Sequence, residues 1–374
     1  MKKICSIALL AVFSLASAFA EETKTKESVP SEVPDTMYVF RTHLLALQPY
    51  LISEEAFTNQ KNEKEVSKHL QALAIFSKNL KKHDRLKTQG FEMTATQLQD
   101  HLNRTHEIYK GGNRSFAWWL FRSSIHACNQ CHMQVAYKKA PTLQLDEGSI
   151  SGTAFDQAEF WYAVRQYQRA LMFYNSVISR YGMDRTSEQE LKASLQRILS
   201  ICLRIDRSPK RALEVLTVAK DHPQISKLVK AQVDAWIQEL QKLSGSSIPD
   251  SMTSSVKAIQ AYATGTSIEG NGPTALLVSG ILMDVVNRRP KEVTPEILFE
   301  LASSLMTSEK DIFFTAADNY FKTCIEKFPN SPVAKKCFQS LKQKWTDGFT
   351  GSAGTNLPED YQAELLRLES KLKK

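Results

Sequence analysis

The sequence lacks most of the signals that mark β-structure or a familiar catalytic site. It contains no alternating β-branched runs joined by Asn-Gly or Asp-Gly hairpins, so a strand-rich fold is not expected. No HExxH pair, Gly-rich phosphate loop or Ser/His/Asp arrangement is present. We therefore expect an all-α protein that is not an enzyme.

Long apolar runs are also scarce beyond the N-terminus. The longest, residues 275–286, is interrupted by a serine, a glycine and an aspartate. A helix needs about 20 apolar residues to cross a bilayer, so this run is too short. We expect no membrane-spanning segment in the mature chain.

The first 20 residues have the pattern of an export signal. Lys2 and Lys3 precede an apolar stretch, and Ala18-Phe19-Ala20 supplies the small residues expected at a cleavage site. Cleavage near Ala20 predicts a periplasmic or secreted protein. Loss of the two lysines lowers the formal charge from +8 to +6, since 46 basic and 40 acidic residues remain. A basic exported protein is expected to meet acidic proteins or membrane surfaces, not nucleic acid.

Periodicity divides the mature chain into a leader and two helical parts. Residues 21–35 are charged and poor in apolar side chains, which predicts a flexible leader. Residues 36–139 contain four amphipathic stripes with short connections, which predict a four-helix bundle. The stripes are Met37, Phe40, Leu44, Leu47, Leu51; Val66, Leu70, Leu73, Ser77, Leu80; Leu98, Leu102, Thr105, Tyr109; and Phe116, Leu120, Ser124, Ala127, Cys131.

The second helical part follows a break in the periodicity at residues 140–153. Residues 154–374 contain large and small residues at the spacings of tetratricopeptide helix pairs, which favours an array of helical hairpins. Such arrays build concave surfaces for protein partners. The first copy contains Trp161, Tyr167, Ala170, Leu171 and Tyr174, and later copies contain Leu203, Ala212, Leu216, Ala219, Ala317, Phe321 and Cys324. Pro358 is expected to start a charged helix that caps the stack.

The most specific motif is Cys128-Asn129-Gln130-Cys131-His132. On a helix, positions i, i+3 and i+4 share one face, so both thiols and the imidazole point at the same group. This motif predicts one covalent haem c, with thioethers from Cys128 and Cys131 and His132 as the proximal iron ligand. A redox dithiol would need a βαβ setting, and a zinc site a second CxxC or a His pair. The sequence contains neither.

A four-helix bundle whose last helix ends in CxxCH resembles the cytochrome c′ family. The resemblance covers residues 36–139, and its sharp motif is Cys128 to His132. It implies a haem across the bundle core, with the first helix over the distal face. Many members leave the iron five-coordinate, while close relatives ligate it with a methionine. The additional helices beyond 139 depart from the family, so its dimer is not assumed here.

The distal residue decides the role of such a haem. The candidates are Met37, His43, Leu44 and Leu45. Phe40-Arg41 resembles the aromatic-Arg pair that precedes the family's distal residue, which favours Leu45, whereas the apolar stripe favours Leu44. An aliphatic wall is favoured over ligation by His43 or Met37. The Trp118-Trp119 pair is expected to be bundle core, and His69, His83, His101 and His106 to be solvated or capping.

Three functions are compatible with these features. The leading one is electron transfer by a single-haem periplasmic cytochrome whose redox partner or other proteins dock on the helical repeats. The second is a five-coordinate haem that binds nitric oxide or carbon monoxide as a carrier or sensor. The third is an interaction scaffold with a structural haem. Low-spin six-coordinate iron supports the first function, and high-spin iron that binds these gases supports the second.

Three cysteines remain in the mature chain. Cys324 and Cys337 lie on either side of a predicted FPNSP turn, at positions that face each other in a helical hairpin. In an oxidising compartment we expect them to form a disulfide. Cys202 lies on an apolar helical face and is expected to be a buried free thiol.

Overall fold

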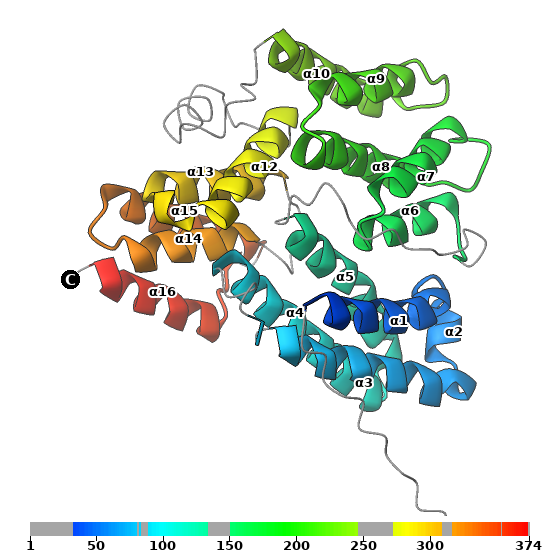
Figure 1. The fold of residues 1–374 in the computed structure, drawn as a ribbon, viewed down its shortest axis with the longest axis horizontal. Coiled ribbons are helices and arrows are strands. Elements are labelled where there is room, and N and C mark those ends of the chain that lie inside the picture. The colour runs from blue at the N-terminus through cyan, green and yellow to red at the C-terminus, as the bar shows by residue number, and fades with distance from the viewer. Residues whose placement is uncertain are drawn as a thin grey trace, which may run out of the picture.

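The computed structural model describes residues 33–80, 82–83, 89–133, 150–245, 272–308, 316–352 and 354–372. These ranges contain fifteen α-helices and, as strands, only the two-residue pair β1 (Thr350–Gly351) and β2 (Gly354–Thr355), so the all-α expectation is confirmed (Figure 1). This small hairpin was not expected. The predicted signal peptide, nearly all of the leader 21–35 and most of the break 140–153 lie outside the described residues.

The N-terminal part, here called the bundle, consists of four long helices and one short helix. Each predicted stripe lies on a long helix, and α1 ends two residues after Pro49. The short α2, which the periodicity did not indicate, is capped by the Ser53 side chain, which accepts a hydrogen bond from Ala56 N at 3.1 Å. The elements are α1 (Val33–Leu51), α2 (Glu54–Thr58), η1 (Gln60–Asn62), α3 (Glu63–Leu80), α4 (Gln89–Lys110) and α5 (Arg114–Met133).

The inner face of α5 differs from the predicted one. Ala117 and Phe121 belong to the buried apolar core of the bundle. Phe116 is 37 % exposed and Trp119 is 45 % exposed, and their rings stack on each other at the surface. Placing Phe116 in the stripe and Trp119 in the core was therefore wrong. Trp118 packs on the core as expected, and its indole N–H donates to Tyr50 O at 3.0 Å.

The remaining helices, here called the array, pack mainly on their neighbours in sequence. Capping boxes begin α6 and α8, with Thr153 paired to Asp156 and Ser187 to Glu190. The array helices are α6 (Ala154–Ala163), α7 (Tyr167–Ser179), α8 (Glu188–Ser200), α9 (Pro209–Lys220), α10 (Lys227–Gly245), α12 (Pro273–Arg288), α13 (Pro295–Ser308), α14 (Ala316–Lys327), α15 (Pro332–Gly348) and α16 (Glu359–Leu372). The helical-hairpin organisation was expected, and α16 starts directly after Pro358.

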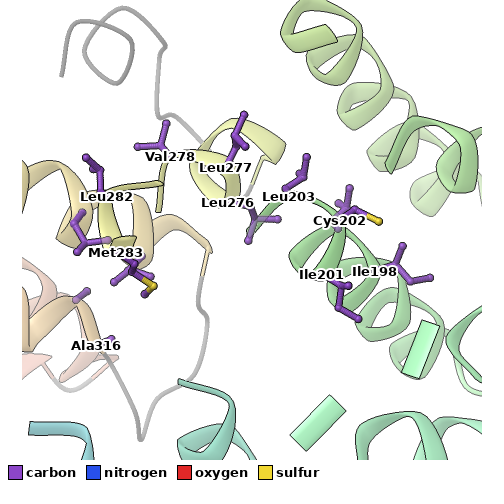
Figure 2. Packing of buried hydrophobic residues seen from close by; sticks show 14 of the residues in the cluster. Ile198, Ile201, Cys202, Leu203, Leu276, Leu277, Val278, Leu282, Met283 and Ala316 are labelled. Carbon is purple, nitrogen blue, oxygen red and sulfur yellow. The ribbon is translucent and has the colours of Figure 1, made fainter. Parts of the chain in front are cut away.

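A π-helical turn, η4 (Ile201–Ile205), continues α8 and is covered by α12. In Figure 2, Leu203 of this turn faces Leu276 and Leu277 of α12. The approach is close enough that a Cβ on Gly280 would lie 2.8 Å from both Cα and O of Arg204. Glycine is therefore required where α12 crosses the turn. A short 3-10 turn, η6 (Pro290–Glu292), leads from α12 to α13.

The three mature cysteines outside the CxxCH motif lie as predicted. Cys324 of α14 and Cys337 of α15 form a disulfide with their Cα atoms 6.4 Å apart. Cys202 is a buried free thiol in the π turn, and burial raises its pKa to about 12. Both predictions are confirmed.

The bundle and the array are in contact at several places among the described residues. Near the end of the CxxCH helix, α5 contacts α6, and farther along the chain α14 packs on α4 (Figure 1). Gln48 of α1 adds a two-way contact, because its amide donates to Ser151 O at 2.7 Å and accepts from Ser151 N at 3.2 Å. The last part of α5 therefore lies next to the array as well as in the bundle.

Candidate functional site

The CxxCH motif lies near the C-terminal end of α5. The helix begins after Asn113, whose side chain accepts a hydrogen bond from Phe116 N at 3.3 Å, and it continues to Met133. Cys128, Cys131 and His132 thus occupy helical positions i, i+3 and i+4, as predicted. The structure describes the side chains of Cys128 and His132, whereas that of Cys131 lies outside the described part.

His132 is oriented by the array. Its Nδ1 lies 2.7 Å from the carbonyl oxygen of Ala163, the last residue of α6. Burial and, to a smaller extent, the positive charge of Arg165 together lower the pKa of His132 to about 4, and the hydrogen bond to the Ala163 carbonyl opposes both. The imidazole is therefore neutral at pH 7. Because a carbonyl oxygen only accepts, Nδ1 carries the proton and the lone pair is on Nε2.

The half-buried Cys128 is a neutral thiol. Desolvation raises its pKa to about 11, so little thiolate forms at neutral pH. A redox dithiol needs thiolate character, which electropositive surroundings normally supply. The environment of Cys128 therefore gives the redox-dithiol alternative no support.

The corner between α6 and α7 is the part of the site that the sequence analysis missed. The motif was placed within residues 36–139, yet the hydrogen-bond partner of His132 is Ala163. Arg165, in the same corner, has a left-handed backbone with φ of 63°. The sequence places a small residue, Ala163, and a basic residue, Arg165, at the end of a predicted tetratricopeptide helix. This pair alone does not distinguish a functional site from an ordinary turn.

The distal candidates divide by the region that they contact. His43 is buried and faces α3, with its Nδ1 2.8 Å from His69 Nδ1 and its ring stacked on Phe76. Leu45 packs on the core of the array, and Leu44 contacts the cores of both parts. Met37 is half-buried against the bundle core. The array-facing side of α1 is thus aliphatic at Leu44 and Leu45.

The other histidines of the bundle are more buried than expected, and several of them form hydrogen bonds to other segments of the bundle. His101 Nε2 lies 2.7 Å from Leu120 O and connects α4 to α5. His106 is 7 % exposed, and burial lowers its pKa, as it does that of His69. His83 Nε2 lies 3.1 Å from Thr36 Oγ1. Solvated or capping roles were therefore wrong for His69, His101 and His106.

Comparison of the chain with known protein families, characterised proteins and solved structures finds no significant match. Within the described ranges, no cluster of three or more His, Cys, Asp or Glu side chains has the arrangement of a metal site.

None of the helices that the structure describes is both long and apolar enough to cross a membrane.

Proposed function

We propose that this chain is an exported single-haem c-type cytochrome that transfers electrons and docks protein partners through its array. The observation that carries this proposal is the 2.7 Å contact between His132 Nδ1 and Ala163 O. Histidines that ligate metals commonly donate their other ring N–H to a backbone carbonyl, which fixes the tautomer and the ring orientation. His132 has this arrangement, with Nε2 left as the iron-binding atom.

The chemistry of the donor set fits a haem c. Cys128 and Cys131 are one helical turn apart on α5 and would each form a thioether with the porphyrin. The neutral imidazole of His132 suits iron ligation, which protonation would prevent. When bound, the haem supplies a one-electron iron couple.

The array supports the docking part of the proposal. Stacked helical hairpins form extended surfaces that bind other proteins, and they rarely carry chemistry themselves. The excess of basic residues in the mature chain favours an acidic partner, because complementary charge accelerates encounter. The contact between α5 and α6 brings the CxxCH helix next to this surface.

A second candidate function, the binding of nitric oxide or carbon monoxide, is favoured by the position of His43. Its ring contacts His69 and Phe76 of α3, while Leu44 and Leu45 face the array. An aliphatic distal wall leaves the sixth position of the iron open to a small gas.

The experiment is an absorption spectrum of the full chain, purified from a host that exports it and matures c-type haems. Covalent haem that survives denaturation supports the cytochrome, and its absence contradicts both functions. A low-spin spectrum that carbon monoxide leaves unchanged supports electron transfer. A high-spin spectrum that shifts with carbon monoxide supports gas binding. The matched control is Cys128→Ser with Cys131→Ser, which is expected to show no haem bands.

A further inference from the structure

One side of α3 carries exposed lysines along its length. Five of them, together with two intervening exposed residues, follow one another at alternating spacings of three and four, so they form one line on the helix surface. The line begins in η1, ends in the turn after α3 and spans about 30 Å. It is here called the lysine stripe and consists of Lys61, Lys64, Lys68, Gln71, Ile75, Lys78 and Lys82.

The two carboxylates of α3 are engaged by other helices of the bundle. Glu63 forms an ion pair with Arg114 of α5 at 2.6 Å, and Glu65 accepts a hydrogen bond from the Tyr50 hydroxyl of α1 at 3.0 Å. None of the five lysines of the stripe forms an ion pair with a carboxylate in the described part of the chain. The stripe therefore keeps an excess of positive charge at the surface.

The opposite side of α3 is buried in the bundle. Val66, Leu70 and Leu73 belong to its core and are at most 3 % exposed. The helix packs on α1 and α4, and Figure 1 shows it along the lower edge of the bundle, remote from α8, α9 and α10. A helix that lies on a membrane inserts its apolar face between the lipids. The apolar face of α3 is occupied by the core, so a lipid surface is not the favoured partner.

The spacing of the stripe and one exposed isoleucine favour a helix as the partner. A line that repeats every 3.5 residues is the geometry with which one helix contacts another along its length. Ile75 is 50 % exposed and lies within this line, with Lys68 before it and Lys78 after it. An apolar centre with a charged rim is a common arrangement in protein interfaces. A second copy of α3 would place lysine against lysine, so the matching helix must be acidic.

We propose that the lysine stripe binds an acidic helix of a partner protein, whose carboxylates repeat at the same spacing and flank an apolar residue opposite Ile75. This surface lies on the bundle, so it is separate from the array surface of the proposed function and does not depend on a haem. Complementary charges steer the encounter of the two helices and fix their register. Because the lysines are exposed, salt weakens the complex.

The first test measures the binding of labelled helical peptides to the purified full chain by fluorescence anisotropy. One peptide has glutamates at the heptad positions that face the lysines and a leucine at the position that faces Ile75. The control peptide has the same composition, with its glutamates distributed around the helix. We expect the control peptide to bind about tenfold more weakly, because its carboxylates cannot all face the stripe. Equal binding of the two peptides, or no binding of either at low salt, overturns the inference.

The second test reverses charges on the chain. The stripe variant combines Lys64→Glu, Lys68→Glu and Lys78→Glu, and it should weaken binding of the matched peptide at least about tenfold. The matched control makes the same change in net charge at exposed lysines of α14 and α15 that also form no ion pair in the described part of the chain. It combines Lys327→Glu, Lys335→Glu and Lys342→Glu.

The control variant should weaken peptide binding less than about threefold, and equal weakening by the two variants overturns the inference, because net charge then explains the binding. Thermal unfolding checks that both variants fold. If the stripe variant does not fold, glutamine replaces glutamate in both variants and the same criteria apply.

The other possible occupants are tested with the same variants. Phosphatidylglycerol vesicles represent a lipid surface, heparin represents another polyanion, and sedimentation measures association of the chain with itself. If the chain binds vesicles or heparin more tightly than the matched peptide and loses this binding in the stripe variant, the inference is overturned. It is also overturned by a dimer that the stripe variant dissociates. These results leave haem attachment at Cys128 and Cys131 unaffected.

Discussion

The bundle and the array connect their helices by different polar contacts. In the bundle several of these contacts use imidazoles, as between His43 and His69 and between His101 and Leu120 O, although Arg114 and Glu63 form an ion pair there. In the array they use ionised groups, as between Arg197 and Glu159 or between Arg367 and Glu326. Imidazoles thus take part in connecting the bundle helices, whereas ion pairs connect helices of the array.

The two parts also differ in how complete they are alone. The array has a continuous core and a disulfide. The bundle has a smaller core, to which α5 contributes Ala117 and Phe121, while His132 on the same helix bonds to the array. Near its C-terminal end, α5 thus contacts the array as well as the bundle.

The largest effect is expected from removing the haem attachment. Cys128→Ser with Cys131→Ser should eliminate covalent haem and loosen the bundle more than the array, because the cofactor would lie against bundle helices. Hydrogen exchange of the two parts, compared with the unsubstituted protein, measures this difference. Equal loosening of the bundle and the array would contradict the expectation that the haem stabilises mainly the bundle.

The next effect concerns the disulfide. Cys324→Ala with Cys337→Ala opens a link across a sequence separation of 13 residues. In the chain-entropy model a loop of this size contributes about 3 kcal/mol to the free energy of unfolding. Denaturant unfolding of the array should report this loss, with little change in the bundle. The control is Cys202→Ser, which alters a free thiol, leaves the disulfide intact and should therefore keep the sensitivity of the array to reductant.

A somewhat smaller effect is expected from Gly280→Ala. The new Cβ would meet the backbone of Arg204 at 2.8 Å, and forced packing of this kind costs about 1–3 kcal/mol. Gly348→Ala, at the end of α15, is the control, because no atom lies within 4 Å of the added Cβ. Thermal unfolding should separate the two variants. Equal stability would show that α12 can move away from the π turn at little cost.

Acid should affect the bundle before the array. Burial lowers the pKa values of His69 and His106 below 6.5, so the unfolded chain binds more protons and the bundle loses stability as pH falls below about 6.5. Hydrogen bonds from Arg367 lower the pKa of Glu364 to about 2, so its contribution is lost only as pH falls from about 4.5 towards 2. Hydrogen exchange at pH 7, 5.5 and 3 would report the order of opening. If α16 opened at a higher pH than α3 and α4, the predicted order of acid unfolding would be contradicted.

The smallest effect is expected from His43→Ala. Because the His43 ring contacts α3, its removal should leave the spectrum of the oxidised haem protein unchanged, at a modest cost in bundle stability. A change from low-spin to high-spin iron in this variant would identify His43 as a ligand and favour electron transfer over gas binding.

Local patterns predicted much of this molecule. The stripes located α1, α3, α4 and α5, because amphipathic spacing reflects which face is buried. The pairing of Cys324 with Cys337 followed from the symmetry of a helical hairpin. Phe116 was misplaced because an apolar residue at the right spacing can still lie at the edge of a stripe.

Contacts between distant segments could not be predicted in the same way. The bond from His132 to Ala163 depends on how α5 approaches α6, and no periodicity encodes that approach. The π turn at 201–205 depends on the fit of α12 at Gly280. The residues of the motif could thus be identified from the sequence, but the groups that orient His132 required the tertiary structure.

The central claim is that Cys128 and Cys131 carry a haem whose iron is ligated by His132. Its most direct test is mass spectrometry of proteolytic peptides from the exported, purified chain. We expect the peptide containing residues 128–132 to carry the mass of one haem and no other peptide to carry it. The control is another c-type cytochrome, which the same host must load with haem in the same experiment. If it does, an unmodified peptide with two free or disulfide-linked cysteines would contradict haem attachment at Cys128 and Cys131.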